Sequence, residues 1–204
     1  ALSSVYDANS PAKPAPYPLS DAAVAGGSGS REAGGSTSGG ATESPACRKF
    51  LGSLPEALGD WRLVHRSAGG SEKGADQGKQ GTDLVKPDLL PDGVDRSVLD
   101  KAPSGSATYL AEEQEPVVIR CGLAMPKSYA PGAQLTQVNK VPWFSDPSLS
   151  RGSTMGRWFA LGHEQVIGLA MPQSAGNEVI SSVSSAISTS LKNTEKAGSS
   201  AQSR

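Results

Sequence analysis

The strongest alternation along the chain lies at residues 117–121 and predicts a strand. The first three of these residues are β-branched, which favours a pleated backbone over a helix. A proline precedes the run and a glycine follows it, so the strand is bounded on both sides. Successive side chains of a strand point to opposite faces. One face should therefore carry Val117, Ile119 and Cys121, which places a cysteine in the core.

Two amphipathic segments predict helices. The first begins at Ser44 and Pro45, a favourable cap and first helical residue, and ends near Pro55. Its apolar positions recur at helical spacing and are Cys47, Phe50, Leu51 and Leu54. The second begins near residues 174–177, with serines along its polar face, so its stability should depend on docking. Its apolar positions are Val179, Ile180, Val183, Ala186, Ile187 and Leu191.

Shorter apolar runs predict further strands, at residues 61–65, 108–110, 134–139, 156–161 and 165–171. The last two flank a tight turn at 162–164 and should form a hairpin. Residues 141–144 should continue the strand of 134–139 past Pro142, which indicates an edge or a bulge. Residues 92–99 predict a short helix. The order of elements predicts an α+β fold, in which an antiparallel sheet has helices packed on one face.

Composition divides the chain into a tether, one domain and a tail. Residues 1–43 are rich in Pro, Gly and Ser and can bury little apolar surface, which predicts a long disordered N-terminal tether. Residues 44–192 should form a single domain with a flexible insert near 67–80, and residues 193–204 a polar tail.

Charge and hydropathy limit the classes of partner. The formal net charge is −1 and no basic stripe is present, so we expect no binding to nucleic acid. No apolar run is long enough to span a bilayer. Attachment to a membrane would therefore need an upstream anchor that this sequence does not contain.

The chain has two cysteines, Cys47 and Cys121, far apart in sequence. In an exported protein such a pair predicts one structural disulfide, whereas in a cytosolic protein two unrelated buried thiols are more common. A disulfide would clamp the first helix onto the central strand. Neither cysteine lies in a CxxC motif, and no zinc, nucleotide-binding or nucleophile motif is present. We therefore expect no metal, no cofactor and no catalytic residue.

Few side chains are candidates for chemistry. The only histidines are His65 and His163. His163 lies in a predicted hairpin turn, where a histidine is more often simply exposed to solvent than a general base or a metal ligand. The acidic run of Glu112, Glu113 and Glu115 is typical of a solvated approach to a strand.

Aromatic side chains are the candidates for a protein interface. Alternation turns either Trp143 or Phe144 outward, and an exposed aromatic ring favours binding. Trp158 is more typical of a core position, and Tyr17 lies in a proline-rich segment that could dock on a partner. The candidate interface residues are Tyr17, Trp143, Phe144 and Trp158.

Several short segments together resemble one known family. They are Ser44-Pro45-Ala46-Cys47, Leu54-Pro55-Glu56-Ala57-Leu58-Gly59, Glu115-Pro116-Val117-Val118-Ile119-Arg120-Cys121-Gly122, Val141-Pro142-Trp143 and Met171-Pro172. They are similar to an uncharacterised actinobacterial family, named only as domain of unknown function thirty-five fifteen, over residues 44–190. The resemblance implies an exported or membrane-anchored envelope protein in which Cys47 and Cys121 form a disulfide. It implies no activity. The glycine-rich insert and the long tail depart from the family pattern.

These observations favour a non-enzymatic, extracytoplasmic protein of the cell envelope that binds other proteins, anchored in its precursor to the cytoplasmic membrane. The expected partner is a membrane protein or membrane complex, and the sharper hypothesis is an accessory subunit of such a complex, for example a respiratory one. The alternative is an envelope hydrolase or small-ligand-binding protein with a site near Trp143 and His163.

Overall fold

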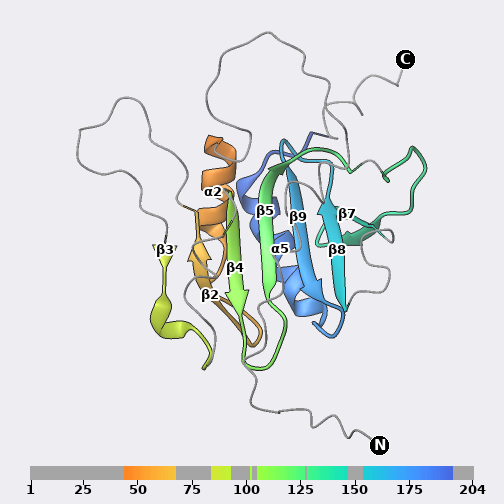
Figure 1. The fold of residues 1–204 in the computed structure, drawn as a ribbon. Coiled ribbons are helices and arrows are strands. Elements are labelled where there is room, and N and C mark those ends of the chain that lie inside the picture. Colours follow the sequence, from red (N-terminus) through yellow and green to blue (C-terminus); the bar gives the residue numbers. More distant parts are fainter. Residues whose placement is uncertain are drawn as a thin grey trace, which may run out of the picture.

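The computed structural model describes residues 44–67, 84–92, 102, 105–126, 128–146 and 154–194 (Figure 1). Its centre is an antiparallel sheet, to which the described residues contribute nine strands. Along the chain these are β1 (Ala57–Leu58), β2 (Trp61–Arg66), β3 (Leu84–Val85), β4 (Ser106–Leu110), β5 (Val117–Leu123), β6 (Thr136–Val138), β7 (Val141–Ser145), β8 (Met155–Ala160) and β9 (Val166–Pro172). Their order across the sheet is β1-β2-β4-β5-β9-β8-β7-β6. β3 pairs with the last two residues of β2, on the side where β1 pairs with the first two.

β5 lies in the middle of the sheet, between β4 and β9. Val117, Ile119 and Cys121 are fully buried in the main core, which confirms the predicted alternation. Val118 and Arg120 on the opposite face are buried as well. The central strand is therefore covered on both sides.

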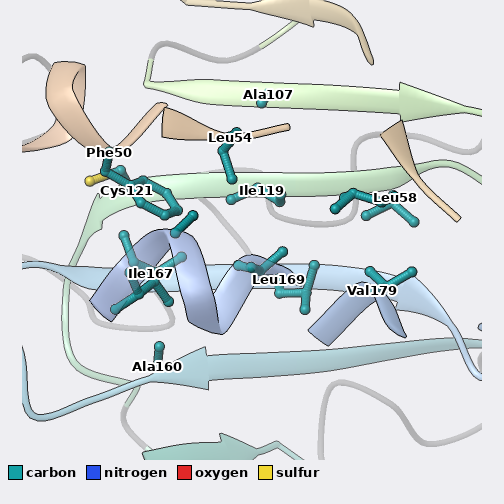
Figure 2. Close-up of a cluster of buried hydrophobic side chains, with 14 of the residues drawn as sticks. Phe50, Leu54, Leu58, Ala107, Ile119, Cys121, Ala160, Ile167, Leu169 and Val179 are labelled. Atoms are coloured by element: carbon teal, nitrogen blue, oxygen red, sulfur yellow. The ribbon is translucent and has the colours of Figure 1, made fainter. Parts of the chain in front are cut away.

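Two helices, α2 (Pro45–Ser53) and α5 (Asn177–Ser190), cover one face of the sheet (Figure 1). The Ser44 hydroxyl caps α2 by accepting a hydrogen bond from the Cys47 N–H at 3.2 Å. The predicted apolar faces of both helices join residues of β5, β8 and β9 in one buried cluster (Figure 2). The predicted α+β architecture, with helices on one face of an antiparallel sheet, is confirmed.

The two buried serines of α5 are compatible with a packed helix because their hydroxyls bond to the helix itself. Ser184 is fully buried and donates to the Ile180 carbonyl at 2.6 Å. Ser190 donates to the Ala186 carbonyl at 2.5 Å. A buried hydroxyl without a partner would destabilise the fold by about 1–3 kcal/mol, so these bonds let α5 place small polar residues against the core.

β6 and β7 form a hairpin rather than one continued strand. Val138 pairs with Val141, so the turn consists of Asn139 and Lys140 alone. Their φ angles are 48° and 66°, as a two-residue turn of type I′ requires. The prediction of one strand through residues 134–144 is wrong because this turn contains no glycine to mark it. β7 is also not at the edge of the sheet, since β6 lies beyond it.

The face of the sheet without helices is buried in smaller clusters. One joins Phe144, Phe159 and Leu161 to side chains of the segment between β5 and β6. In this cluster the Tyr129 ring packs edge-on against Phe144, with ring centres 5.5 Å apart. A second small cluster contains Val64, Leu110 and Leu90. The segment between β5 and β6 thus covers an apolar surface that the sheet would otherwise expose.

Several predicted segments lie largely outside the described residues. These are the tether (1–43), the insert near 67–80, the helix at 92–99 and most of the tail. The folded region continues past the predicted boundary at 192, because Asn193 pairs with His163 and the Thr194 N–H donates to the Gly162 carbonyl at 3.0 Å. The structure also adds β3 and the short 3-10 helix η2 (Pro87–Leu89), which the sequence pattern did not predict.

Candidate functional site

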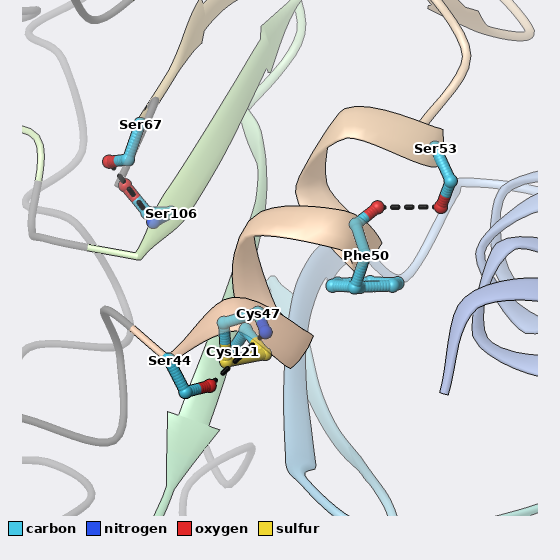
Figure 3. The surroundings of a disulfide bond; sticks show 7 residues. All are labelled: Ser44, Cys47, Phe50, Ser53, Ser67, Ser106 and Cys121. Atoms are coloured by element: carbon cyan, nitrogen blue, oxygen red, sulfur yellow. Dashed lines mark hydrogen bonds between the residues drawn. A yellow bond between two sulfur atoms is a disulfide. The ribbon is translucent and has the colours of Figure 1, made fainter. Parts of the chain in front are cut away.

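Cys47 in the first turn of α2 and Cys121 in β5 form a disulfide with a Cα–Cα distance of 5.5 Å (Figure 3). Both residues are fully buried, and no free cysteine remains. The predicted clamp between the first helix and the central strand is confirmed. Because no thiol is exposed, the bond acts as a structural cross-link, and a bond of this kind indicates a protein that folds outside the reducing cytoplasm.

Trp143 is fully buried among the core residues beneath α5. Its indole N–H donates to the Ser184 hydroxyl at 2.8 Å, which ties β7 to the middle of the helix. The side chain therefore contributes to the packing of α5 on the sheet, and within the described fold it is not available to a ligand or a partner.

Phe144 points to the opposite face, as alternation requires, but it is only 6% exposed. The expectation that Trp143 or Phe144 would be exposed is wrong, because Tyr129 and its neighbours cover the outer face at this position. Trp158 is half-buried and packs against the main core. Tyr17 lies outside the described residues. The three described aromatic residues, Trp143, Phe144 and Trp158, do not form one exposed surface.

The two histidines lie far apart in the sheet and have different surroundings. His65 is buried in β2, opposite Thr108 of β4. His163 lies in the turn between β8 and β9, with its Nδ1 3.1 Å from the Leu161 carbonyl oxygen. Its neighbour Glu164 accepts a hydrogen bond from the Lys192 N–H at 3.0 Å. The turn thus holds the end of α5 in place, and none of the described residues form a group able to hold a metal ion.

Two open grooves lie at the other end of the strands, around the β4–β5 loop (residues 111–116). The first groove has a volume of about 540 Å³ and lies between this loop, the β1–β2 turn and η2. Its walls carry both apolar and charged side chains. They are Asp60, Arg62, Asp88, Leu89, Leu90, Pro91, Asp92, Leu110, Ala111, Glu112 and Gln114.

The second groove, of about 460 Å³, lies on the other side of the same loop, against the start of β8 and the end of β9. It is lined by Glu113, Gln114, Glu115, Thr154, Pro172, Gln173 and Ser174. Gln114 lines both grooves, so the loop forms the ridge between them.

The β4–β5 loop is held by hydrogen bonds from both sides. The Trp61 indole N–H donates to the Glu115 carbonyl at 3.0 Å. The Thr154 hydroxyl lies 2.6 Å from each oxygen of the Glu115 carboxylate and donates to it. Burial lowers the pKa of Arg157, and the nearby Glu115 carboxylate opposes that shift. The ridge is therefore positioned by neighbouring strands.

The two grooves concentrate negative charge at this end of the sheet, which we call the acidic end. Their lining contains six carboxylates and one guanidinium, whereas the whole chain has 20 acidic and 19 basic residues. The carboxylates are Asp60, Asp88, Asp92, Glu112, Glu113 and Glu115. Such a surface attracts cationic groups and repels phosphates.

Sequence reasoning identified half of this surface and gave it no function. The run of three glutamates was visible, but it is also the usual composition of an exposed loop. The aspartates come from the β1–β2 turn and from the segment around η2, and only the fold brings them next to the glutamates. The residue pattern along one segment cannot reveal a cluster that is formed by three separate segments.

The comparisons with known proteins place the chain without assigning it a role. A family model described as protein of unknown function (DUF3515) matches residues 78–196, more than half of the chain. The matched region contains Cys121 but not Cys47. No curated protein and no solved structure matches. Within the described part of the chain, no helix is both long enough and apolar enough to cross a membrane.

Proposed function

Because the chain belongs to the DUF3515 family, whose function is unknown, we propose a role based on its own structure: a protein-binding module of the cell envelope, outside the cytoplasm, without catalytic activity. The observation that carries the proposal is the buried Cys47–Cys121 disulfide. Such bonds persist in oxidising compartments and are rare in the cytosol. The disulfide thus supports the location, and the open surface at the acidic end supports binding.

The chemistry of the described residues favours binding over catalysis. His163 interacts with the backbone of its own turn, and Glu164 accepts from the end of α5. Trp143 is enclosed in the core. A hydrolase or a small-ligand site near Trp143 and His163 would need an accessible tryptophan and a base directed at a substrate, so this alternative gains no support from the geometry.

The proposed partner is a membrane protein or membrane complex, to which this chain is an accessory subunit. The arrangement of the folded region supports such a role. Ser44, which follows the predicted tether, lies beside the disulfide, and Thr194 pairs with the β8–β9 turn at the same end of the sheet. The acidic end lies at the opposite end of β5, so a tethered domain would present its grooves away from the point of attachment.

Two measurements in intact cells producing the full-length protein test the proposal. Cells are first quenched in acid, and their proteins are then denatured and alkylated without a reductant, because both cysteines are buried in the fold. We expect neither cysteine to be modified; modification of both would contradict the extracytoplasmic location. A membrane-impermeant cross-linker is added to separate, intact cells, and the protein is purified from detergent-solubilised membranes. We expect a covalent adduct with another protein, whereas recovery only at monomer size would contradict the role in binding.

A further inference from the structure

We infer that the two grooves at the acidic end form one docking surface for a basic polypeptide segment of a partner protein, one that combines Lys or Arg with apolar side chains. The inference rests on the proposed function, since it names the chemistry of the partner at that surface. It depends on the shape, the charge and the position of the grooves.

The shape suits an extended segment rather than a compact small molecule. The grooves lie on both sides of the β4–β5 loop and meet at Gln114. Both are open, and together they run from the η2 segment across the loop to the start of β8. A segment that crossed the ridge would contact both grooves at once.

The negative charge of the grooves determines which class of molecule can bind there. The six carboxylates of the grooves outnumber the lining cation Arg62 and the nearby Arg157, which interacts with Glu115. A cationic segment would be attracted to this surface and would associate faster at low salt. A nucleic acid or an anionic lipid surface would be repelled. A bound metal ion does not fit, because no group of carboxylates among the described residues is arranged to hold one.

The first groove also offers an apolar contact. Leu89 is 40% exposed, and Leu90, Pro91 and Ala111 are half-buried around it. Large apolar residues with this degree of exposure are few in the described chain, and Leu89 is the one that lines a groove. An apolar side chain of the partner would cover it, so the segment should be amphipathic and not merely basic.

The position of the grooves keeps them away from the first and last described residues. Five residue steps along β5 separate Cys121 from the end of the β4–β5 loop at residue 116, which is about 17 Å. Ser44 and Thr194, the first and last described residues, lie at the disulfide end. A segment can therefore reach the grooves without displacing either end of the folded region.

The test uses the full-length protein in its own cells, with the photocrosslinking residue p-benzoylphenylalanine placed at Gln114. The control places it at Ser188, on the exposed side of α5. We expect an adduct from position 114 and none from position 188. Mass spectrometry of the adduct should identify a partner segment that has a net positive charge and apolar side chains.

The identified segment is then synthesised with a fluorescent label, and its affinity is measured by anisotropy. The variant Glu112→Gln/Asp88→Asn should bind it about tenfold more weakly, and added salt should weaken binding to the wild type. The control Gly52→Lys/Thr189→Lys changes the net charge by the same amount on exposed helix positions and should bind like the wild type. Circular dichroism confirms that both variants fold.

The outcomes separate this inference from the proposed function. An adduct from position 188 alone, or a neutral or acidic partner segment, leaves a protein-binding module but overturns the docking surface. An adduct with a second copy of this chain, with lipid or with nucleic acid also overturns it, as does an unchanged affinity of the groove variant. No adduct from either position, together with no adduct in the general cross-linking experiment, contradicts the proposed function itself.

Discussion

Replacing both cysteines, Cys47→Ala/Cys121→Ala, tests how much of the stability depends on the link between α2 and β5. The disulfide closes a loop with a sequence separation of 74. Loop-closure entropy for that length gives about 4 kcal/mol. The loss of two buried sulfur atoms adds on the order of 1 kcal/mol. Since small domains are stable by about 5–15 kcal/mol, the variant should retain only part of its stability.

Chemical and thermal unfolding, followed by circular dichroism, measure this loss. For about 120 folded residues the unfolding entropy is ~0.25 kcal/mol/K, so a total loss of ~5 kcal/mol should lower Tm by about 20 °C. Wild type treated with a reductant should unfold about 4 °C above the variant, because both lack the cross-link but the reduced protein keeps its two buried sulfur atoms. The oxidised wild type serves as the reference.

Two results would refute this reasoning. A loss below ~1 kcal/mol would show that the cross-link does not restrict the unfolded chain as its length requires. Free thiols in freshly purified, denatured and unreduced protein would show that the bond itself is absent.

Three further predictions concern single side chains. Trp143→Phe should lower the free energy of unfolding, measured in denaturant, by about 1–3 kcal/mol. The Ser184 hydroxyl would no longer accept a hydrogen bond from the indole N–H, and a cavity would form in the core. Trp158→Phe is the matched control and should give a smaller loss. Burial raises the pKa of Tyr109 above its usual range, so the contribution of this residue to stability should be fully present below pH ~10 and fall as the pH rises beyond it. Tyr109→Phe should lose the hydrogen bond to the Pro55 carbonyl, which is about 1 kcal/mol. The stability of this variant should also depend less on pH in the alkaline range. Asn139→Ala should destabilise the fold by about 1–2 kcal/mol, because it removes hydrogen bonds to Ser181 and Ser185 and places alanine at a positive φ. Lys140→Gly in the same turn should not destabilise the fold, since glycine adopts positive φ without strain. Equal losses for the two variants would contradict the turn assignment.

The main elements of the fold could be predicted because each has a local signal. The β-branched run gave β5, and the spacing of apolar residues gave α2 and the buried face of α5. The disulfide was predicted from the disulfide usage of exported proteins and from the family resemblance, and the structure shows Cys47 bonded to Cys121. These predictions hold because pattern and burial agree along one segment.

The remaining features depend on contacts between segments. Alternation correctly placed Trp143 and Phe144 on opposite faces, but it could not show that Tyr129 covers the outer one. The Asn139–Lys140 turn escaped notice because it adopts positive φ without glycine. Only the glutamate run of the acidic end could be seen in the sequence, because its aspartates come from separate parts of the chain.

The shared location of Ser44 and Thr194 has a practical consequence for experiments on this domain. A fluorescent protein or an affinity handle fused at either side of residues 44–194 would emerge at the disulfide end of the sheet, away from the six carboxylates. Immobilisation on a sensor chip through either fusion should therefore give the same response to a soluble ligand of the grooves. For the same reason, the domain could be inserted into a loop of an unrelated host protein without stretching its sheet.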